Sequence, residues 1–104
     1  MIVQLNTDKN IQGTDNLESY VTERIEGVLK HLTDHITRIE VHLTDQNADK
    51  SGPDDNQCKL EARLEGRQPI VVTSVADTRE KALDDAAKKL KASLTTIVGK
   101  MKEH

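Results

Sequence analysis

The chain has 104 residues, which suits one domain with a single hydrophobic core rather than two. Hydrophobic residues make up 35% and charged residues 32%, and the single cysteine, Cys58, excludes an internal disulfide. The N-terminus has no basic segment followed by an apolar stretch, and no apolar run is long enough to span a bilayer. We therefore expect a cytoplasmic protein.

Charge is distributed unevenly along the chain. The net charge of −3 argues mildly against a nucleic-acid partner. Residues 1–57 contain 5 basic and 11 acidic side chains, whereas residues 58–104 contain 10 basic and 7 acidic ones. Tyr20 is the single aromatic residue, so a protein that stacks single-stranded bases on aromatic rings is not expected.

The first half of the chain begins with a short strand and a helix. Residues 2–5 are an extended candidate, and a helix follows with Thr14 or Asp15 as its N-cap. Apolar residues recur at helical spacing, and we expect this helix to end near Leu32–Thr33. The predicted apolar stripe consists of Leu17, Tyr20, Val21, Ile25, Val28, Leu29 and Leu32.

Three strands and a long helix follow. Residues 37–44 and 58–65 alternate apolar and polar side chains with the period of a half-buried strand, and residues 70–75 are rich in β-branched types. A helix is predicted from Thr78, with Asp77 beginning a capping-box pattern. Its predicted apolar stripe consists of Leu83, Ala86, Ala87, Leu90, Leu94, Ile97 and Met101.

The predicted order of elements, βαβββα, gives an α+β fold in one domain. The βαβ crossover favours a parallel pair for the first two strands. Short connections favour an antiparallel meander for the strands that follow. We therefore expect a four-stranded sheet with both helices packed on one face, while the other face is open to water.

Four segments of the chain carry a family likeness. They are the opening strand, the helix start Gly13-Thr14-Asp15-x-Leu17-x-x-Tyr20-Val21, the strand Ile39-x-Val41-x-Leu43, and the C-terminal helix that runs from Asp77 through Lys81-Ala82-Leu83-Asp84-Asp85-Ala86-Ala87-Lys88-Lys89-Leu90 to Lys100-Met101-Lys102-Glu103-His104. Over essentially the whole chain, their order and spacing resemble the short ribosome hibernation promoting factors, also called ribosomal subunit interface or sigma-54 modulation proteins. No single motif among them is diagnostic.

The resemblance implies a domain similar to double-stranded RNA-binding domains. It also implies binding to the small ribosomal subunit near the decoding region, and inhibition of translation under stress. Long family members carry a further C-terminal dimerisation domain, and the resemblance implies a short form, with residues 1–104 as one domain without it. No cofactor, small-molecule substrate or membrane is expected, and the expected state is a monomer or weak dimer.

Basic side chains on the two helices are the candidates for contact with ribosomal RNA. Lysines on a rigid helix can neutralise phosphates and release counterions, although a solvated helix face has the same composition. Arg24 borders the apolar stripe, where it could reach a phosphate or cover the edge of the core with its stem. One flank of the C-terminal helix holds Lys81, Lys88, Lys91 and Lys102, and the other holds Lys89 and Lys100. The predicted RNA-binding residues are Arg24, Lys30, Arg79, Lys81, Lys88, Lys89, Lys91, Lys100 and Lys102.

The first helix departs from the family pattern. Ribosome-binding members usually carry basic residues along it, whereas Glu18, Glu23 and Glu26 occupy much of its surface here. The alternative function is therefore a divergent, non-ribosomal regulatory module on the same fold. Such a module would bind a basic protein through its acidic first half, or pair with itself through the open sheet face.

The remaining polar clusters have simple structural interpretations. Arg38 and Arg63 could form a weak basic patch on the open sheet face, but nearby outward glutamates favour ion pairing. These glutamates are Glu40, Glu61 and Glu65. The acidic segment 45–56 resembles a calcium loop, but Lys50 stands in place of the turn glycine and Asn56 in place of the bidentate glutamate. A solvated loop is therefore expected there.

Chemistry on histidine or cysteine is not expected. His31 and His35 have the spacing that binds one metal ion on a helix, but the expected helix end falls between them. Cys58 heads an alternating strand and is expected to be a small buried hydrophobe. There is no phosphate-binding loop or nucleophile motif, so we expect a binding protein rather than an enzyme.

Overall fold

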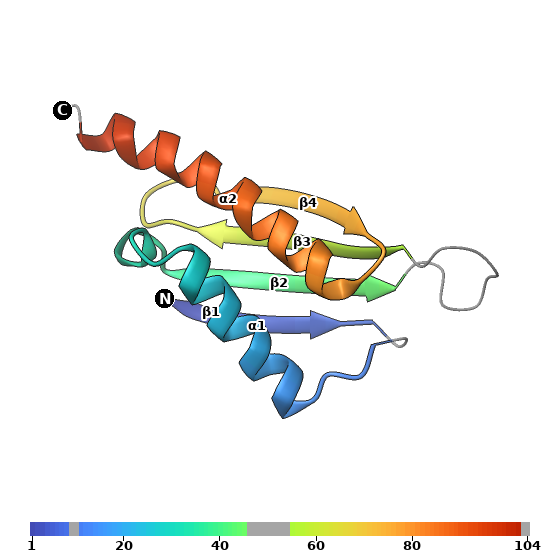
Figure 1. Ribbon diagram of the computed structural model, residues 1–104. Helices are drawn as coiled ribbons and strands as arrows, with labels where there is room; N and C mark the ends of the chain where they lie inside the picture. The colour runs from blue at the N-terminus through green and yellow to red at the C-terminus, as the bar shows by residue number, and fades with distance from the viewer. Residues whose placement is uncertain (9–10, 46–54, 103–104) are drawn as a thin grey trace.

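A single four-stranded sheet, in the order β1-β2-β3-β4, carries both helices on the same face (Figure 1). The computed structural model describes residues 1–8, 11–45 and 55–102, with only the backbone of residues 101 and 102. The elements are β1 (Ile2–Thr7), α1 (Asp15–Val28), the 3₁₀ helix η1 (Thr33–His35), β2 (Arg38–Asp45), β3 (Asn56–Arg63), β4 (Ile70–Ala76) and α2 (Arg79–Lys102). The predicted βαβββα order and α+β class are confirmed.

Strand pairing follows the predicted topology. β1 pairs with β2 in parallel, with Val3 opposite Ile39, whereas β2–β3 and β3–β4 are antiparallel. Both helices return from the end of the sheet where β2 and β4 finish, so their C-termini lie at the same end of the molecule (Figure 1). This arrangement decides which charged side chains become neighbours.

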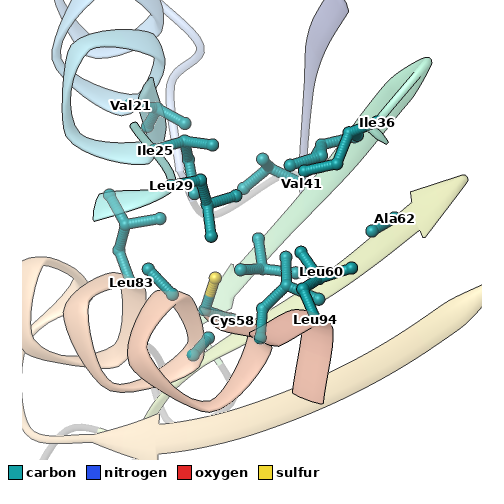
Figure 2. Close-up of a cluster of buried hydrophobic side chains, with 14 of the residues drawn as sticks. Val21, Ile25, Leu29, Ile36, Val41, Cys58, Leu60, Ala62, Leu83 and Leu94 are labelled. Atoms are coloured by element: carbon teal, nitrogen blue, oxygen red, sulfur yellow. The ribbon is translucent and has the colours of Figure 1, made fainter. Parts of the chain in front are cut away.

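The core lies between the sheet and the two helices. Because side chains alternate along a strand, Val41 on β2 and Leu60 on β3 both point at the helices and are fully buried. In Figure 2 they meet Ile25 from α1 and Leu83 from α2 in one apolar cluster. Burying a side chain of this size contributes roughly 1.5–3 kcal/mol. The central strands and the helix stripes therefore hold the two helices in a fixed relation.

The end of α1 differs from the prediction. The helix stops at Val28, not near Leu32–Thr33, and Leu29 donates its N–H to the Ile25 carbonyl at 3.0 Å. The Leu32 N–H then bonds the Leu29 carbonyl at 2.8 Å and closes a tight turn that leads into η1. Leu29 and Leu32 remain buried although they lie outside the helix. The apolar pattern continued past the helix because the turn also faces the core.

The apolar stripes are also shifted at their borders. Tyr20 is 40% exposed, so the predicted core position is wrong for this residue, and Val28 is half-buried. On α2, Val98 is buried at 5% exposure, whereas the predicted Ile97 is only half-buried. β3 begins two residues earlier than predicted, and Leu64 is buried just beyond its end.

Candidate nucleic-acid interface

The length of α2 separates the predicted RNA-binding residues into groups. The helix has 24 residues and is therefore about 36 Å long. Arg79 and Lys81 lie in its first turn and Lys100 in its last, about 30 Å apart along the axis. A single compact phosphate site cannot include all of them.

Three of the predicted cations are paired with carboxylates. Arg79 contacts Glu80 at 3.3 Å and Lys81 contacts Asp77 at 3.2 Å, both at the start of α2. Arg24 on α1 donates a hydrogen bond from Nε to Asp84 on α2. This hydrogen bond, together with the attraction between the two charges, raises the pKa of Arg24, so the guanidinium stays charged. These cations are partly neutralised before any phosphate approaches.

A second group of lysines lies on the flank of α2 that faces α1. Lys91 lines a groove together with Val28 and His31 from the end of α1. This shared groove identifies the flank of α2 that faces α1. Lys88 is one helical turn earlier, and both lysines are exposed. Lys30, in the turn after α1, is exposed as well. None of these three lysines forms an ion pair with a carboxylate among the residues that the structure describes.

The other flank of α2 holds fewer available charges. Lys89 reaches the free edge of β4, where its Nζ donates to the Thr73 carbonyl at 3.0 Å. Lys100 is exposed near the end of the helix. Lys102, which helical periodicity places on the flank with Lys88 and Lys91, belongs to the last turn, and its side chain lies outside the described residues. Lys89 therefore helps to cover an exposed strand edge.

Sequence reasoning missed two residues of this surface. Asp84 holds Arg24 from a position 60 residues away, and no local pattern could have predicted that pairing. His31 was considered only as a metal ligand, whereas it lies on the groove beside Lys91. Helical periodicity could not place His31 on this groove, because the residue follows the turn that ends α1 at Val28.

The outer face of α1 has the opposite charge. A shallow hollow of about 410 Å³ runs along it and is lined by Asp15, Glu18 and Glu23, together with two small hydroxyl residues. Phosphates are repelled from such a surface. The outer face of α1 is therefore unfavourable for contact with an RNA backbone.

The open sheet face contains ion pairs, as the alternating pattern predicted. Arg38 and Arg63 lie directly opposite each other, and both contact Glu40, at 3.4 and 3.9 Å. Arg63 also contacts Glu61 at 3.8 Å. A hydrogen bond with the Glu61 carboxyl group, supported by the two arginines, holds the pKa of Glu40 below its usual value. The arginines of this face are thus engaged with acids, while Glu65 forms no ion pair with a described cation.

The structure offers little for other chemistry. Because α1 ends at Val28, His31 and His35 do not share a helix, and no group of metal-binding side chains occurs among the described residues. Burial raises the pKa of the Cys58 thiol to about 12, so it is a weak nucleophile (Figure 2). The acidic loop compared with a calcium site lies mostly outside the described residues, at positions 46–54. No described helix is long and apolar enough to cross a bilayer.

Comparison with known proteins agrees with this architecture. The fold is similar to a ribosomal subunit interface protein from Coxiella burnetii, with 16% identity, a TM-score of 0.75, and coverage of 95% of this chain and 99% of that one. The N-terminal domain of Thermus thermophilus Protein Y is equally similar, with 16% identity, a TM-score of 0.75, and coverage of 93% and 99%. No curated protein sequence matches the chain. Residues 6–102 match the family described as Sigma 54 modulation protein / S30EA ribosomal protein, and the chain belongs to that family.

Proposed function

We propose that this protein binds ribosomal RNA of the small subunit near the decoding region and inhibits translation as a hibernation factor. Its family is described as one of ribosomal proteins, and a similar structure is titled a ribosomal subunit interface protein. The observation that carries the proposal is the flank of α2 toward α1. There Lys88 and Lys91 are exposed and form no ion pair with a described carboxylate.

The proposed mechanism combines backbone binding with steric exclusion. Lysines on a rigid helix neutralise phosphates and release counterions, which gives affinity without reading base sequence. The acidic outer face of α1 disfavours binding in the opposite orientation. A folded domain held in this way in the decoding region would occupy the space of mRNA and tRNA.

The predicted residues divide into three roles within this proposal. Lys30, Lys88 and Lys91 form the primary contacts, with Lys102 next along the same flank of α2 and Lys100 as a further cation on the other flank. Lys89 contributes after it leaves the Thr73 carbonyl, and Arg24 after it leaves Asp84. Arg79 and Lys81 remain with their acidic partners at the far end of α2 and contribute least.

Sucrose-gradient cosedimentation with small subunits at two salt concentrations tests this function. The triple variant Lys88→Glu, Lys89→Glu, Lys91→Glu should lower binding by more than about tenfold, because three favourable phosphate contacts become repulsive. Binding of the unmodified protein should also weaken as salt rises.

A matched single-charge comparison provides the control. Lys91→Glu should weaken binding, whereas Lys59→Glu, which makes the same charge change on the open sheet face, should have much less effect. Absence of cosedimentation at low salt, or equal binding by the triple variant, would exclude the proposed function.

A second candidate function follows from the acidic hollow along α1. The carboxylates of Asp15, Glu18 and Glu23 line it together, which favours a basic protein as partner. Affinity capture followed by analysis of both protein and RNA separates the two candidates. A single basic protein in the eluate without ribosomal RNA, lost on Glu18→Lys, would favour the second.

A further inference from the structure

An apolar groove lies between the two helices, beside Lys91. Its volume is about 350 Å³, and it lies where the end of α1 approaches the C-terminal half of α2. Its walls include Val28, Leu32 and Val98, while His31 and Lys91 stand among them. This size is at the lower end of the range for small-ligand sites in proteins.

The charges of the groove select an anion. Lys91 is a cation, the His31 ring can donate a hydrogen bond, and none of the described residues that line the groove is a carboxylate. Lys88 continues the positive flank one turn away. By contrast, the hollow on the outer face of α1 is lined by carboxylates, which would repel an anion. A fitting ligand has an apolar body joined to a negative group.

We propose that this groove holds one unstacked nucleotide of single-stranded RNA. The base packs between Val28, Leu32 and Val98, and its phosphate lies against Lys91. This inference rests on the proposed function, because the same row of lysines brings the RNA backbone to the mouth of the groove. Bases in a duplex are stacked and paired and cannot enter, whereas a single strand can turn a base outward at low cost.

The absence of aromatic side chains from the groove shapes what it recognises. Tyr20, the single aromatic residue of the chain, does not line it. The base is therefore held by aliphatic contacts rather than by ring stacking. Such contacts do not read the hydrogen-bonding edge of the base, so binding should tolerate different sequences and be weak without the lysines.

A glycine gives direct access to the groove without disturbing the core. A Cβ built at Gly99, which lines the groove, meets no atom within 4 Å, so a side chain can be added there. Leucine at this position would occupy the space of the base. A Cβ at Gly27 on α1 likewise meets nothing within 4 Å, but Gly27 does not line the groove. Gly27→Leu is therefore the matched control for Gly99→Leu.

The test uses the full chain and a hexauridylate single strand, monitored by methyl NMR. The methyl signals of Val28, Leu32 and Val98 should shift and saturate with the single strand, but not with a duplex of the same length. Gly99→Leu should weaken hexauridylate binding by about fivefold or more, while Gly27→Leu binds as the unmodified protein does. Thermal unfolding of both variants confirms that each is folded.

Several results would overturn the inference. These are equal methyl shifts with duplex and single strand, shifts confined to lysine signals, or unchanged binding by Gly99→Leu. A leucine-containing acidic peptide that shifts the same methyls at lower concentration than the RNA would make the groove a protein-docking site instead.

Ribosome cosedimentation separates this inference from the proposed function. If the unmodified protein and Gly99→Leu bind small subunits equally, the proposed function stands and the nucleotide site is excluded. If hexauridylate fills the groove but the protein does not bind small subunits, the groove stands as a single-strand site and the proposed function fails.

Discussion

Arg24 and Asp84 connect the two helices through one exposed ion pair, and the side chains are 44% and 30% exposed. Ion pairs with this exposure are screened by water, so the contact contributes little to stability. Its larger effect is electrostatic, because Asp84 occupies the guanidinium that would otherwise be available for a phosphate. Under the proposed function, the aspartate would therefore compete with RNA for Arg24.

Removing this competition should strengthen RNA binding. Asp84→Asn removes a negative charge beside the lysine flank and frees Arg24, so we expect affinity for ribosomal RNA to rise by about two- to tenfold at low salt. The free energy of unfolding should change little, because the pair is exposed to solvent. Filter binding and thermal unfolding measure the two effects.

Asp85→Asn is the control, because it makes the same change in net charge at an exposed neighbouring position. Helical periodicity places Asp85 on the other flank, away from Arg24. If both variants gain affinity equally, net charge alone accounts for the effect and the competition for Arg24 is not real.

The strands could be predicted from the sequence where one face of the sheet is covered by helices and the other is open to water. Ile39, Val41 and Leu43 alternate with polar residues because β2 is a central strand with helices on one side only. The edge strand β4 is less regular, since Val71 and Val75 face water while Ser74 faces the helices. The composition of β4 alone does not show which strand it pairs with.

Helix starts were predicted to within one residue, but the capping residue was ambiguous. Asp15 with Glu18, and Asp77 with Glu80, fit the capping-box spacing, yet the caps are threonines. The Thr14 hydroxyl accepts from the Leu17 N–H, and the Thr78 hydroxyl accepts from the Lys81 N–H, both at 3.1 Å. Adjacent residues of suitable type compete for the same position, and the entry angle of the chain decides between them.

The candidate site was predictable only as a list of lysines. Helical periodicity separated Lys88 and Lys91 from Lys89, but it could not show which lysines meet a partner. Those partners come from other elements: Asp84 meets Arg24 across the helix pair, and the Thr73 carbonyl of β4 meets Lys89. Such contacts depend on packing between segments distant in sequence.

The cap of α1 can be tested directly. Thr14→Ala should lower the free energy of unfolding by about 1 kcal/mol, because the Leu17 N–H loses its acceptor. For a domain of this size the corresponding fall in Tm is about 4–8 °C. Thr14→Ser keeps the hydroxyl and should retain most of the stability, as thermal unfolding followed by circular dichroism would measure. Equal losses in both variants would mean that the methyl group, not the cap, matters.

At the scale of the whole molecule, charge is arranged along the helices. Asp15 and Glu18 lie in the first turn of α1 and Glu80 in that of α2, whereas Lys100 lies near the end of α2. Since both helices point the same way, these charges favour the helix dipoles, with acidic groups at the start of both helices and a lysine near the end of α2 (Figure 1). This arrangement contributes to helix stability and, under the proposed function, would also orient the molecule on RNA.

The salt dependence of RNA binding should report this polarity. The molecule is 53 Å along its longest axis, and the Debye length at physiological salt is about 8 Å, so charges at opposite ends of the molecule are screened from each other. Lys91→Gln should reduce the slope of log K against log salt by about 0.7–0.9, the value for one lost phosphate contact. Asp15→Asn should leave the slope unchanged and alter affinity by less than about twofold at 0.15 M salt, since Asp15 begins α1 and lines the acidic hollow rather than the groove beside Lys91. Fluorescence anisotropy across a salt series measures both variants. Equal changes in slope would mean that RNA contacts both ends of the molecule, and binding through the basic flank of α2 would then be the wrong geometry.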